Sequence, residues 1–420
     1  MKRRDFLQSI ALGAIPLTGC GLLRVDPWHV LIRSDRILTL EDEQRVLNKA
    51  RLAWTDDGRI RVLFVRGTGY ERGYQQGALL RKQIGVNLGY LYRRAVAKFR
   101  LEEMFHESYE RLRPFIPQEY IDEMHGLAHG SQLPLALIHA IHALPSMTEW
   151  GGKRHIKEVL KQMMSGELAT SCSNFGVTGN ASHDGRLYAV RVLDWGLHRI
   201  SKLHQYPLLT VNLPEQGIPH LNIGWMGFLG AVSGMNAQQI TLGEMGYKNP
   251  PNETLRGKPM PFLLRDILML AENLSDVRKI ISGSVPTNSF VYMMTDGKSK
   301  ESELYIRDAD RFEVFKPNTR INDNQIDNPA LPDTIYGGHY NDRLYSKLSA
   351  LSGELTPQLI MEQVIPEIAM ASNFQNVIYD PANLSIWVSN AQGENRRAAE
   401  QPYTYFDFGA ALEWFSSKSS

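Results

Sequence analysis

The hydrophobic pattern of the 420-residue chain changes near residue 170. Before that point, apolar residues such as Leu80, Ile84 and Leu88 recur at helical spacing, which predicts amphipathic helices. After it, short alternating runs such as "RLYAVRVLDW" are separated by turn residues such as His183-Asp184-Gly185, a pattern typical of strands. Helices followed by a strand-rich half predict an α+β fold rather than a doubly wound parallel sheet.

The same patterns predict individual elements. In the first half we expect a strand over residues 59–65, a glycine-rich turn and a long helix in "GTGYERGYQQGALLRKQIGVNLGYLYRRAVAKFR", then helices over 117–130 and over 133–144, before Pro145. The polar residues 151–169 predict a boundary between two parts of the chain. In the second half we expect helices over 261–274, 342–351 and 357–368, strands over 290–294 and 303–307, and a strand, turn and strand around Asp380-Pro381.

Composition excludes some classes of protein. Hydrophobic residues make up 43% and charged residues 22% of the chain, which are ordinary values for a folded globular protein. The formal net charge of +1 provides no field that would attract nucleic acid. We therefore expect no nucleic-acid partner.

The first 20 residues, "MKRRDFLQSIALGAIPLTGC", are typical of an export signal. Arg3 and Arg4 match the twin-arginine pattern, and the apolar stretch over 10–17 is shorter than the roughly 20 residues that span a bilayer. The end of the signal resembles a bacterial lipobox, which predicts lipidation of Cys20. The expected location is the periplasmic side of a bacterial cell envelope, with membrane contact through the lipid anchor only. The alternatives are an unprocessed signal, or a Cys20 that merely lies near a cleavage site.

Cys172 is the second of the two cysteines in the chain. If Cys20 carries a lipid, Cys172 has no disulfide partner within the chain, although the expected compartment is oxidising. A buried cysteine often acts as a small hydrophobic side chain. The alternative is that Cys172 has a reactive thiol. The residues near Cys172 in the sequence help to decide between these two roles.

The segment "CSNFGVTGNASHDGRLYAVRVLDW" predicts a hairpin that starts at Cys172. Its return strand carries Arg191 and Asp194 back toward the cysteine. A guanidinium group lowers the pKa of a nearby thiol, and a carboxylate orients a nearby amine. The alternative is an ion pair that only stabilises the hairpin.

These residues resemble the N-terminal nucleophile (Ntn) hydrolases with a cysteine nucleophile, and most of all the acyl-CoA:6-aminopenicillanate (isopenicillin N) acyltransferase-like family. The resemblance rests on Cys, a short strand, Asp-Gly, and then Arg-x-x-Asp-Trp. Val192 stands where the family usually has Asn, and Ser171 stands where many members have Gly. The resemblance implies a four-layer αββα sandwich with a helical N-terminal part.

Further segments extend the resemblance over most of residues 60–410. "VRGTGYERGYQQGALL" is similar to the family's strand and Gly-Tyr-Gln-x-Gly turn, and "YIDEMHGLAHGSQLP" to its Glu-x-x-Gly-x-Ala helix. "GAVSGMNAQQITLGEMG" is similar to its Gly-x-Asn turn between strands. The ordered set is more specific than any one segment.

The resemblance implies activation by self-cleavage between Ser171 and Cys172. The chain would then consist of a signal (1–20), a helix-rich segment (21–171) and a catalytic segment (172–420), with the last two remaining associated in one Ntn unit. The new α-amino group of Cys172, whose ordinary pKa is near 8, would act as the base for its own thiol. The implied substrates are small acyl-amides or acyl-thioesters, and no cofactor is expected.

Three further polar residues are candidates for the site. Asn288, in "PTNSF", matches an Asn of related Ntn hydrolases that would stabilise the oxyanion, and its alternative is a plain turn residue. Glu244 falls where relatives place a polar active-site residue, and its alternative is an edge-strand carboxylate. Asn236 is interpreted as a turn former.

Several other side chains are also consistent with a purely structural role. Trp195, Trp225, Met226 and Phe228 suit an apolar acyl pocket, but such residues are as often part of a core. The histidines at 125, 129, 139 and 142 lie at near-helical spacing, yet we expect no metal site. Two other classes of protein stay open, namely an inactive Ntn fold that serves as a binding lipoprotein and a papain-like hydrolase with a Cys–His pair.

Overall fold

The structure is a computed structural model that describes residues 38–95, 102–149, 172–196, 201–247, 255–323, 326–338, 340–393 and 395–418. Residues 34–420 form one compact unit. Its described part contains two large sheets and many helices, so the predicted α+β class is confirmed. Among the described residues, no helix is both long and apolar enough to span a membrane.

The larger sheet has nine strands in the order β1-β2-β5-β6-β7-β8-β9-β10-β11. Adjacent strands in this sheet pair antiparallel, except that β2 and β5 pair parallel. The strands are β1 (Arg51–Trp54), β2 (Arg61–Gly67), β5 (Pro207–Pro214), β6 (His220–Trp225), β7 (Gly234–Asn236), β8 (Ile240–Gly246), β9 (Phe290–Asp296), β10 (Glu301–Arg307) and β11 (Phe312–Phe315). Both halves of the chain therefore contribute strands to one sheet.

The smaller sheet is antiparallel throughout, in the order β14-β3-β4-β15-β16-β17. Its strands are β3 (Ser173–Gly179), β4 (Gly185–Asp194), β14 (Thr334–Gly338), β15 (Asn373–Asp380), β16 (Ser385–Asn390) and β17 (Thr404–Asp407). The hairpin predicted after Cys172 forms β3 and β4. A separate two-stranded sheet joins β12 (Ile321–Asn322) and β13 (Asp327–Asn328).

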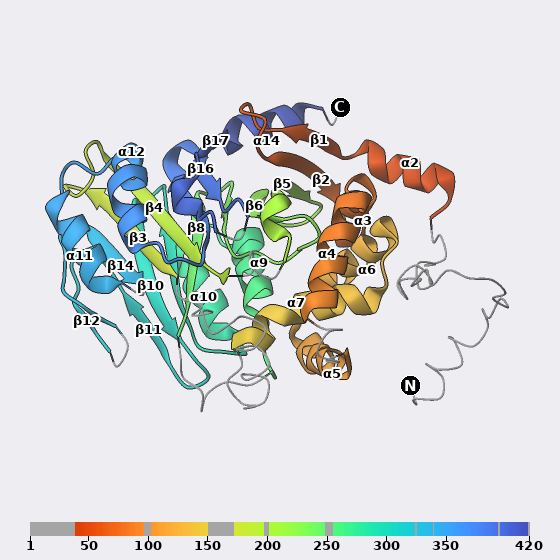
Figure 1. The fold of residues 1–420 in the computed structure, drawn as a ribbon, viewed down its shortest axis with the longest axis horizontal. Helices are drawn as coiled ribbons and strands as arrows, with labels where there is room; N and C mark the ends of the chain where they lie inside the picture. Colours follow the sequence, from red (N-terminus) through yellow and green to blue (C-terminus); the bar gives the residue numbers. More distant parts are fainter. Residues whose placement is uncertain are drawn as a thin grey trace. The chain divides into compact units, whose positions relative to one another are not determined.

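The two large sheets pack face to face (Figure 1). Buried side chains from both sheets, such as Val211 and Val377, share one hydrophobic core. The outer face of the six-stranded sheet packs through Phe175 and Val190 against helices that carry Leu344 and Ile360. On the nine-stranded sheet the outer helices are α3, α9 and α10, which contact β2, β7 and β9 among other strands. The four layers predicted for the fold are therefore present.

The described residues form α-helices along the whole chain. They are α2 (Leu40–Asn48), α3 (Gly69–Leu79), α4 (Arg81–Ala95), α5 (Glu102–Leu112), α6 (Gln118–Ser131), α7 (Leu135–Glu149), α9 (Met260–Leu270), α10 (Leu274–Gly283), α11 (Asn341–Ala350), α12 (Pro357–Leu359), α13 (Ile365–Ile368) and α14 (Phe408–Ser417). A π-helical turn over Ile360–Val364 joins α12 to α13. The helix predicted over 261–274 ends at Leu270, and α10 begins at Leu274, where Asn273 caps the new helix by accepting from the backbone N–H of Asp276.

Two expectations for the first half of the chain are wrong. The glycine-rich segment is not a turn but helix α3, whose N-terminus has a capping box between Thr68 and Glu71. Its glycines recur every fourth residue and lie on the face that packs against α6. A Cβ atom at Gly73 would lie 1.9 Å from the carbonyl oxygen of Glu123, and one at Gly126 would lie 2.0 Å from that of Tyr70. Glycine is needed there for close helix packing rather than for a turn.

The other wrong expectation concerns the end of α7. A proline inside a helix removes one backbone hydrogen bond and crowds the preceding turn, which is why the predicted helix ended before Pro145. The observed helix continues through Pro145 to Glu149. Leu144 and Met147, on either side of the proline, are almost fully buried, so tertiary packing outweighs the local penalty.

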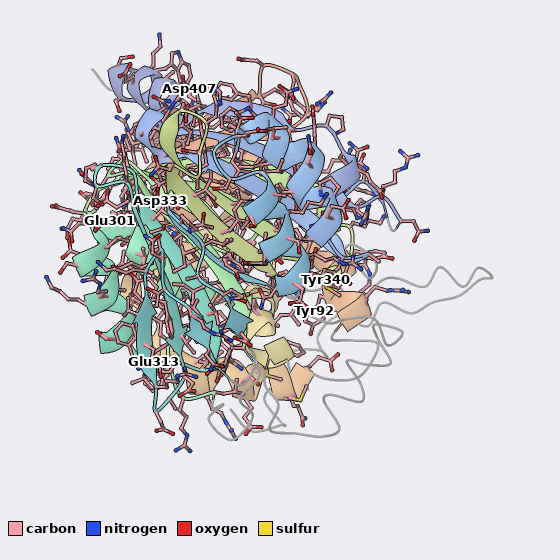
Figure 2. All side chains as sticks on the ribbon, turned by 90° about the vertical axis from the view of Figure 1, so that its left-hand side faces the viewer. Tyr92, Glu301, Glu313, Asp333, Tyr340 and Asp407 are labelled. Atoms are coloured by element: carbon pink, nitrogen blue, oxygen red, sulfur yellow. The ribbon has the colours of Figure 1, made fainter. Side chains whose placement is uncertain are left out.

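The edge strand β11 of the nine-stranded sheet is partly exposed, whereas β10 is exposed only at its first residue. Figure 2 labels Glu301 of β10 and Glu313 of β11, and both side chains are exposed. Figure 2 also labels Asp407, which caps α14 by accepting from the N–H of Ala410. Arg191 and Glu244, by contrast, lie where the two sheets face each other.

Candidate active site

The hairpin of β3 and β4 positions three of the predicted site residues. Ser173 pairs with Val192, and Asn174 pairs with Arg191. Cys172 therefore precedes β3 at the level where β4 ends, close to Arg191 and Asp194. All three side chains are buried, with Cys172 only 5% exposed.

Arg191 connects the thiol with a carboxylate of the other sheet. Its guanidinium forms a hydrogen bond with the Cys172 thiol, and its Nη2 pairs with Oε1 of Glu244 on β8. Its Nε donates to the carbonyl oxygen of Val232 over 3.4 Å. Cys172, Arg191 and Glu244 thus form a buried cluster that spans the space between the sheets.

Burial favours the protonated form of the Cys172 thiol. Burial raises the pKa of Cys172 to about 12, Arg191 opposes the rise, and Glu244 and Asp194 add to it. The same burial raises the pKa of Glu244, again against Arg191. A thiol reacts as the thiolate, so Cys172 needs a base before it can attack a carbonyl group.

Asp194 lies at the end of β4, opposite Asn373 of β15. Its Oδ1 accepts the backbone N–H of Met370 over 3.2 Å. Its Oδ2 is buried and has no hydrogen-bond partner among the described residues. Burial raises the pKa of Asp194 to about 7, although hydrogen bonds from Asn373 and Met370 oppose the rise. The carboxyl group therefore has one free oxygen and an ionisation close to neutral pH.

Asn288 is less closely tied to this cluster. It is buried, lies two residues before β9, and donates from Nδ2 to the carbonyl oxygen of Ser146 over 3.4 Å. Its Oδ1 has no partner among the described residues. Since no described contact joins Asn288 to Cys172, its role as an oxyanion donor stays a prediction.

The remaining sequence predictions have mixed outcomes. Asn236 is a turn former, because its Oδ1 accepts from the N–H groups of Gln238 and Ile240 and its Nδ2 donates to Leu268 and Ala271. Cys20 and Ser171 lie outside the described residues. In the described part of the chain, no group of three or more His, Cys, Asp or Glu side chains is placed to hold a metal ion.

Two residues at the site had not been predicted. Tyr379 of β15 donates to the carbonyl oxygen of Leu242 over 3.2 Å and accepts from the N–H of Gly234 over 3.0 Å, so it joins the two sheets beside Arg191. Asn373 of β15 pairs with Asp194 of β4, and its side-chain hydrogen bond opposes the rise in the pKa of Asp194. Tyr379 occurs in a segment that the sequence marks only as a strand, and Asn373 lies before that segment, because partners distant in the sequence leave no local pattern.

A small apolar cavity includes Trp195, the residue after Asp194, in its lining. It encloses about 20 Å³ and is lined by Leu88, Leu91, Ile141, Leu144, Pro145, Trp195, Leu203, Trp225 and Phe228. Trp195 directly follows Asp194, and Trp225 stacks on Phe374, which directly follows Asn373. Three of the four residues predicted for an apolar pocket thus share one cavity, whereas Met226 is buried but is not among the lining residues.

Three curated proteins are similar in sequence over part of this chain. Protein dcd1B of Dictyostelium discoideum is 22% identical over 63% of this chain and 53% of its own length. Protein dcd1A of the same organism is 24% identical over 56% and 58%, and an uncharacterized protein of Archaeoglobus fulgidus is 21% identical over 60% and 44%. The chain thus spans about half the length of these relatives. No family model matches it.

Among solved structures, three similar chains are named as an acid amidase, an acylase and a bile acid hydrolase. The Caenorhabditis elegans ortholog of N-acylethanolamine-hydrolyzing acid amidase is 12% identical with a TM-score of 0.41, over 55% of this chain and 98% of its own. Penicillin V acylase from Agrobacterium tumefaciens is 9% identical with a TM-score of 0.33, over 52% and 83%. A mutant conjugated bile acid hydrolase from Clostridium perfringens is 10% identical with a TM-score of 0.33, over 56% and 96%.

Proposed function

We propose that this protein is an Ntn hydrolase or acyltransferase that uses Cys172 to cleave acyl-amide or acyl-thioester bonds. The observation that carries the proposal is the buried cluster in which the Arg191 guanidinium contacts both the Cys172 thiol and Glu244. A buried cation beside a thiol favours the thiolate. The sequence resemblance to the isopenicillin N acyltransferase-like family supports the same assignment.

In the intact chain the α-amino group of Cys172 cannot act as a base. The nitrogen of Cys172 is part of a peptide bond, and the pKa of the thiol is raised to about 12 by burial. Cleavage after Ser171 would begin with attack of the thiol on the Ser171 carbonyl carbon. The peptide C–N bond breaks, its nitrogen takes the thiol proton and becomes the α-amino group, and water then hydrolyses the resulting thioester between Ser171 and Cys172.

In the cleaved form, the α-amino group of Cys172 would take the proton from its own thiol. The thiolate attacks the acyl carbon of the substrate, and the C–N bond breaks as the leaving nitrogen receives that proton. Water, or an amine acceptor in a transferase, then attacks the thioester and releases the thiol. The free Oδ2 of Asp194 is suited to hold the α-ammonium group that forms during these steps.

The cleaved segments would remain associated through the fold. Strand β2 belongs to the first segment, and it pairs along its whole length with β5 of the second. Helix α3 also packs against strands of both segments. Separating the fragments would expose this large shared core, which opposes dissociation.

The acyl group would enter the apolar cavity beside Trp195 and Phe228. Its present volume of about 20 Å³ holds little more than one water molecule, so the lining side chains must move apart to admit an acyl chain. An apolar pocket of this kind favours hydrocarbon over charged groups.

We further propose that the protein is exported and anchored at Cys20 by lipid on the periplasmic side of a bacterial envelope. Support comes from Arg3, Arg4 and the lipobox-like end of the signal.

The proposed cleavage is tested by sequencing the N-termini of the purified protein. We expect two polypeptides on a denaturing gel, the second beginning at Cys172, and their co-elution on native gel filtration. Cys172→Ala should give one polypeptide and lose all hydrolysis of N-acyl amides. A single wild-type chain, together with full activity in Cys172→Ala, would contradict the Ntn mechanism. A cleaved protein that turns over no acyl-amide or thioester would instead favour the binding-lipoprotein alternative.

A further inference from the structure

The loop between β6 and β7 is held by side chains from several surrounding elements. Its backbone carries the following hydrogen bonds: Asn87 Nδ2 to the Met226 carbonyl (2.9 Å), the Gly227 N–H to Gln76 Oε1 (2.8 Å), the Leu229 N–H to His142 Nε2 (2.9 Å) and Asn222 Nδ2 to the Gly230 carbonyl (3.1 Å). Arg265 also donates to the Leu229 carbonyl. This loop, residues 226–233, also contains the Val232 carbonyl that accepts from Arg191.

His142 makes two contacts with this loop. Its Nε2 accepts the N–H of Leu229, and its ring stacks on Phe228 with 5.4 Å between ring centroids and an interplanar angle of 2°. Phe228 lines the apolar cavity together with Trp195 and Trp225. His142 therefore fixes both the backbone and the ring that form one wall of the cavity.

The protonation of His142 follows from its partners. Nδ1 lies 2.7 Å from the carbonyl oxygen of Ile138, which can only accept, so Nδ1 carries the hydrogen. Nε2 is then the acceptor that the Leu229 N–H requires, and the ring is neutral. Burial lowers the pKa of His142 to about 4, with the Ile138 hydrogen bond opposing the shift. The residue is thus a fixed acceptor at neutral pH and has no free nitrogen for acid–base chemistry.

We propose that His142 is a positioning residue that determines which acyl groups the cavity accepts by fixing Phe228. This inference rests on the proposed function. Because helix α7 carries His142 and also Pro145 of the cavity lining, the helix-rich segment would contribute directly to substrate selection. Phe228 would be the rigid wall, and acyl groups that need this wall to move would be disfavoured.

Two substitutions separate the roles of the two nitrogens. His142→Gln places an amide oxygen near the Nε2 position and can still accept from Leu229. His142→Asn reaches only the Nδ1 position and leaves the Leu229 N–H unpaired. His125→Asn on α6 is the matched control, because His125 has no contact with the loop among the described hydrogen bonds and ring contacts.

The first readout is the acyl-chain preference of the cleaved enzyme. We expect the ratio of kcat/KM for long over short N-acyl amides to change at least about tenfold in His142→Asn, mainly through KM. His142→Gln should restore most of the wild-type ratio, and His125→Asn should keep it. Phe228→Leu should change the ratio in the same direction as His142→Asn, which keeps the test valid if His142→Asn folds poorly.

The second readout does not depend on activity. Hydrogen exchange at the Leu229 amide should be slow in the wild type and in His142→Gln, and at least about tenfold faster in His142→Asn. An unchanged acyl preference in both His142→Asn and Phe228→Leu would overturn the inference, as would unchanged exchange at Leu229. Loss of the Cys172-dependent activity itself would instead count against the proposed function.

Discussion

At the scale of single residues, the site is governed by burial of charged groups. Arg191 and Glu244 are almost inaccessible to solvent, at 0% and 5% exposed, and each is the other's counter-ion. A buried ion pair is costly to break, because removal of one partner leaves the other charge uncompensated. The arrangement holds a guanidinium next to the thiol while the intact chain keeps that thiol protonated.

The effect of burial on a charged group can be measured at Asp194. Its folded pKa is raised to about 7 by burial, above the ordinary value of about 3.9. The folded state therefore binds a proton that the unfolded state has released between about pH 4 and 7, and stability falls as the pH rises through this window. In the uncleaved Cys172→Ala background, Asp194→Asn should raise the free energy of unfolding at pH 8 by roughly 1 to 4 kcal/mol.

Denaturant unfolding of both variants at pH 4.5 and pH 8 measures this difference. The gain should shrink at pH 4.5, where the carboxyl group is protonated in the folded state. Asp380→Asn is the control, because its carboxylate pairs with Arg186 over 2.8 Å, so the change should lower stability at pH 8. A gain from Asp194→Asn that is equal at both pH values would rule out the raised pKa.

At the scale of elements, close packing of α3 on α6 depends on glycine. Positions 69, 73 and 77 on α3 face positions 126 and 130 on α6, and at each of them a Cβ atom would meet backbone of the other helix at less than 3.0 Å. The sequence shows this spacing plainly, but glycines every fourth residue suit both a turn-rich segment and a helix contact. Only the position of the second helix distinguishes the two.

Gly73→Ala should therefore destabilise the protein. The new methyl group forces α3 away from α6, and overpacking of this kind costs about 1 to 3 kcal/mol or more. Gly85→Ala on α4 is a matched control, since its Cβ would have no neighbour within 4 Å. Alanine there should be neutral or stabilising by up to about 1 kcal/mol. Thermal unfolding of both variants measures the difference, and equal effects would contradict the packing argument.

At the scale of the whole molecule, the two segments of the chain complete one another. Strand β2 from the first segment lies inside the nine-stranded sheet, between β1 and β5. The cavity is lined by α4 and α7 from the first segment and by Trp195, Trp225 and Phe228 from the second. A cleavage before Cys172 would therefore divide the covalent chain without dividing the core.

The proposed lipid anchor makes a prediction at this scale. In a bacterial host that has the lipoprotein-processing enzymes, the protein should incorporate labelled fatty acid and fractionate with membranes. Cys20→Ser should abolish the label, whereas Cys172→Ala should keep it. Label retained in Cys20→Ser would contradict the anchor, and an unlabelled wild type would favour the unprocessed-signal alternative.

The sequence by itself determined the features that depend on local pattern. Helical spacing in the first half and alternation in the second were sufficient for the α+β class. The hairpin after Cys172 followed from a turn between two alternating runs, and this hairpin alone brings Arg191 and Asp194 to the cysteine. Periodicity and turn chemistry act over a few residues, so one chain is enough to show them.

Tertiary structure decided the features that depend on distant partners. The pairing of Glu244 with Arg191 joins residues on different sheets, and the contact of His142 with Leu229 joins residues 87 positions apart. Tertiary packing also explains why α7 continues through Pro145 and why the glycine-rich segment is helical. Burial and long-range packing outweigh local propensity at these positions, and neither leaves a pattern along the chain.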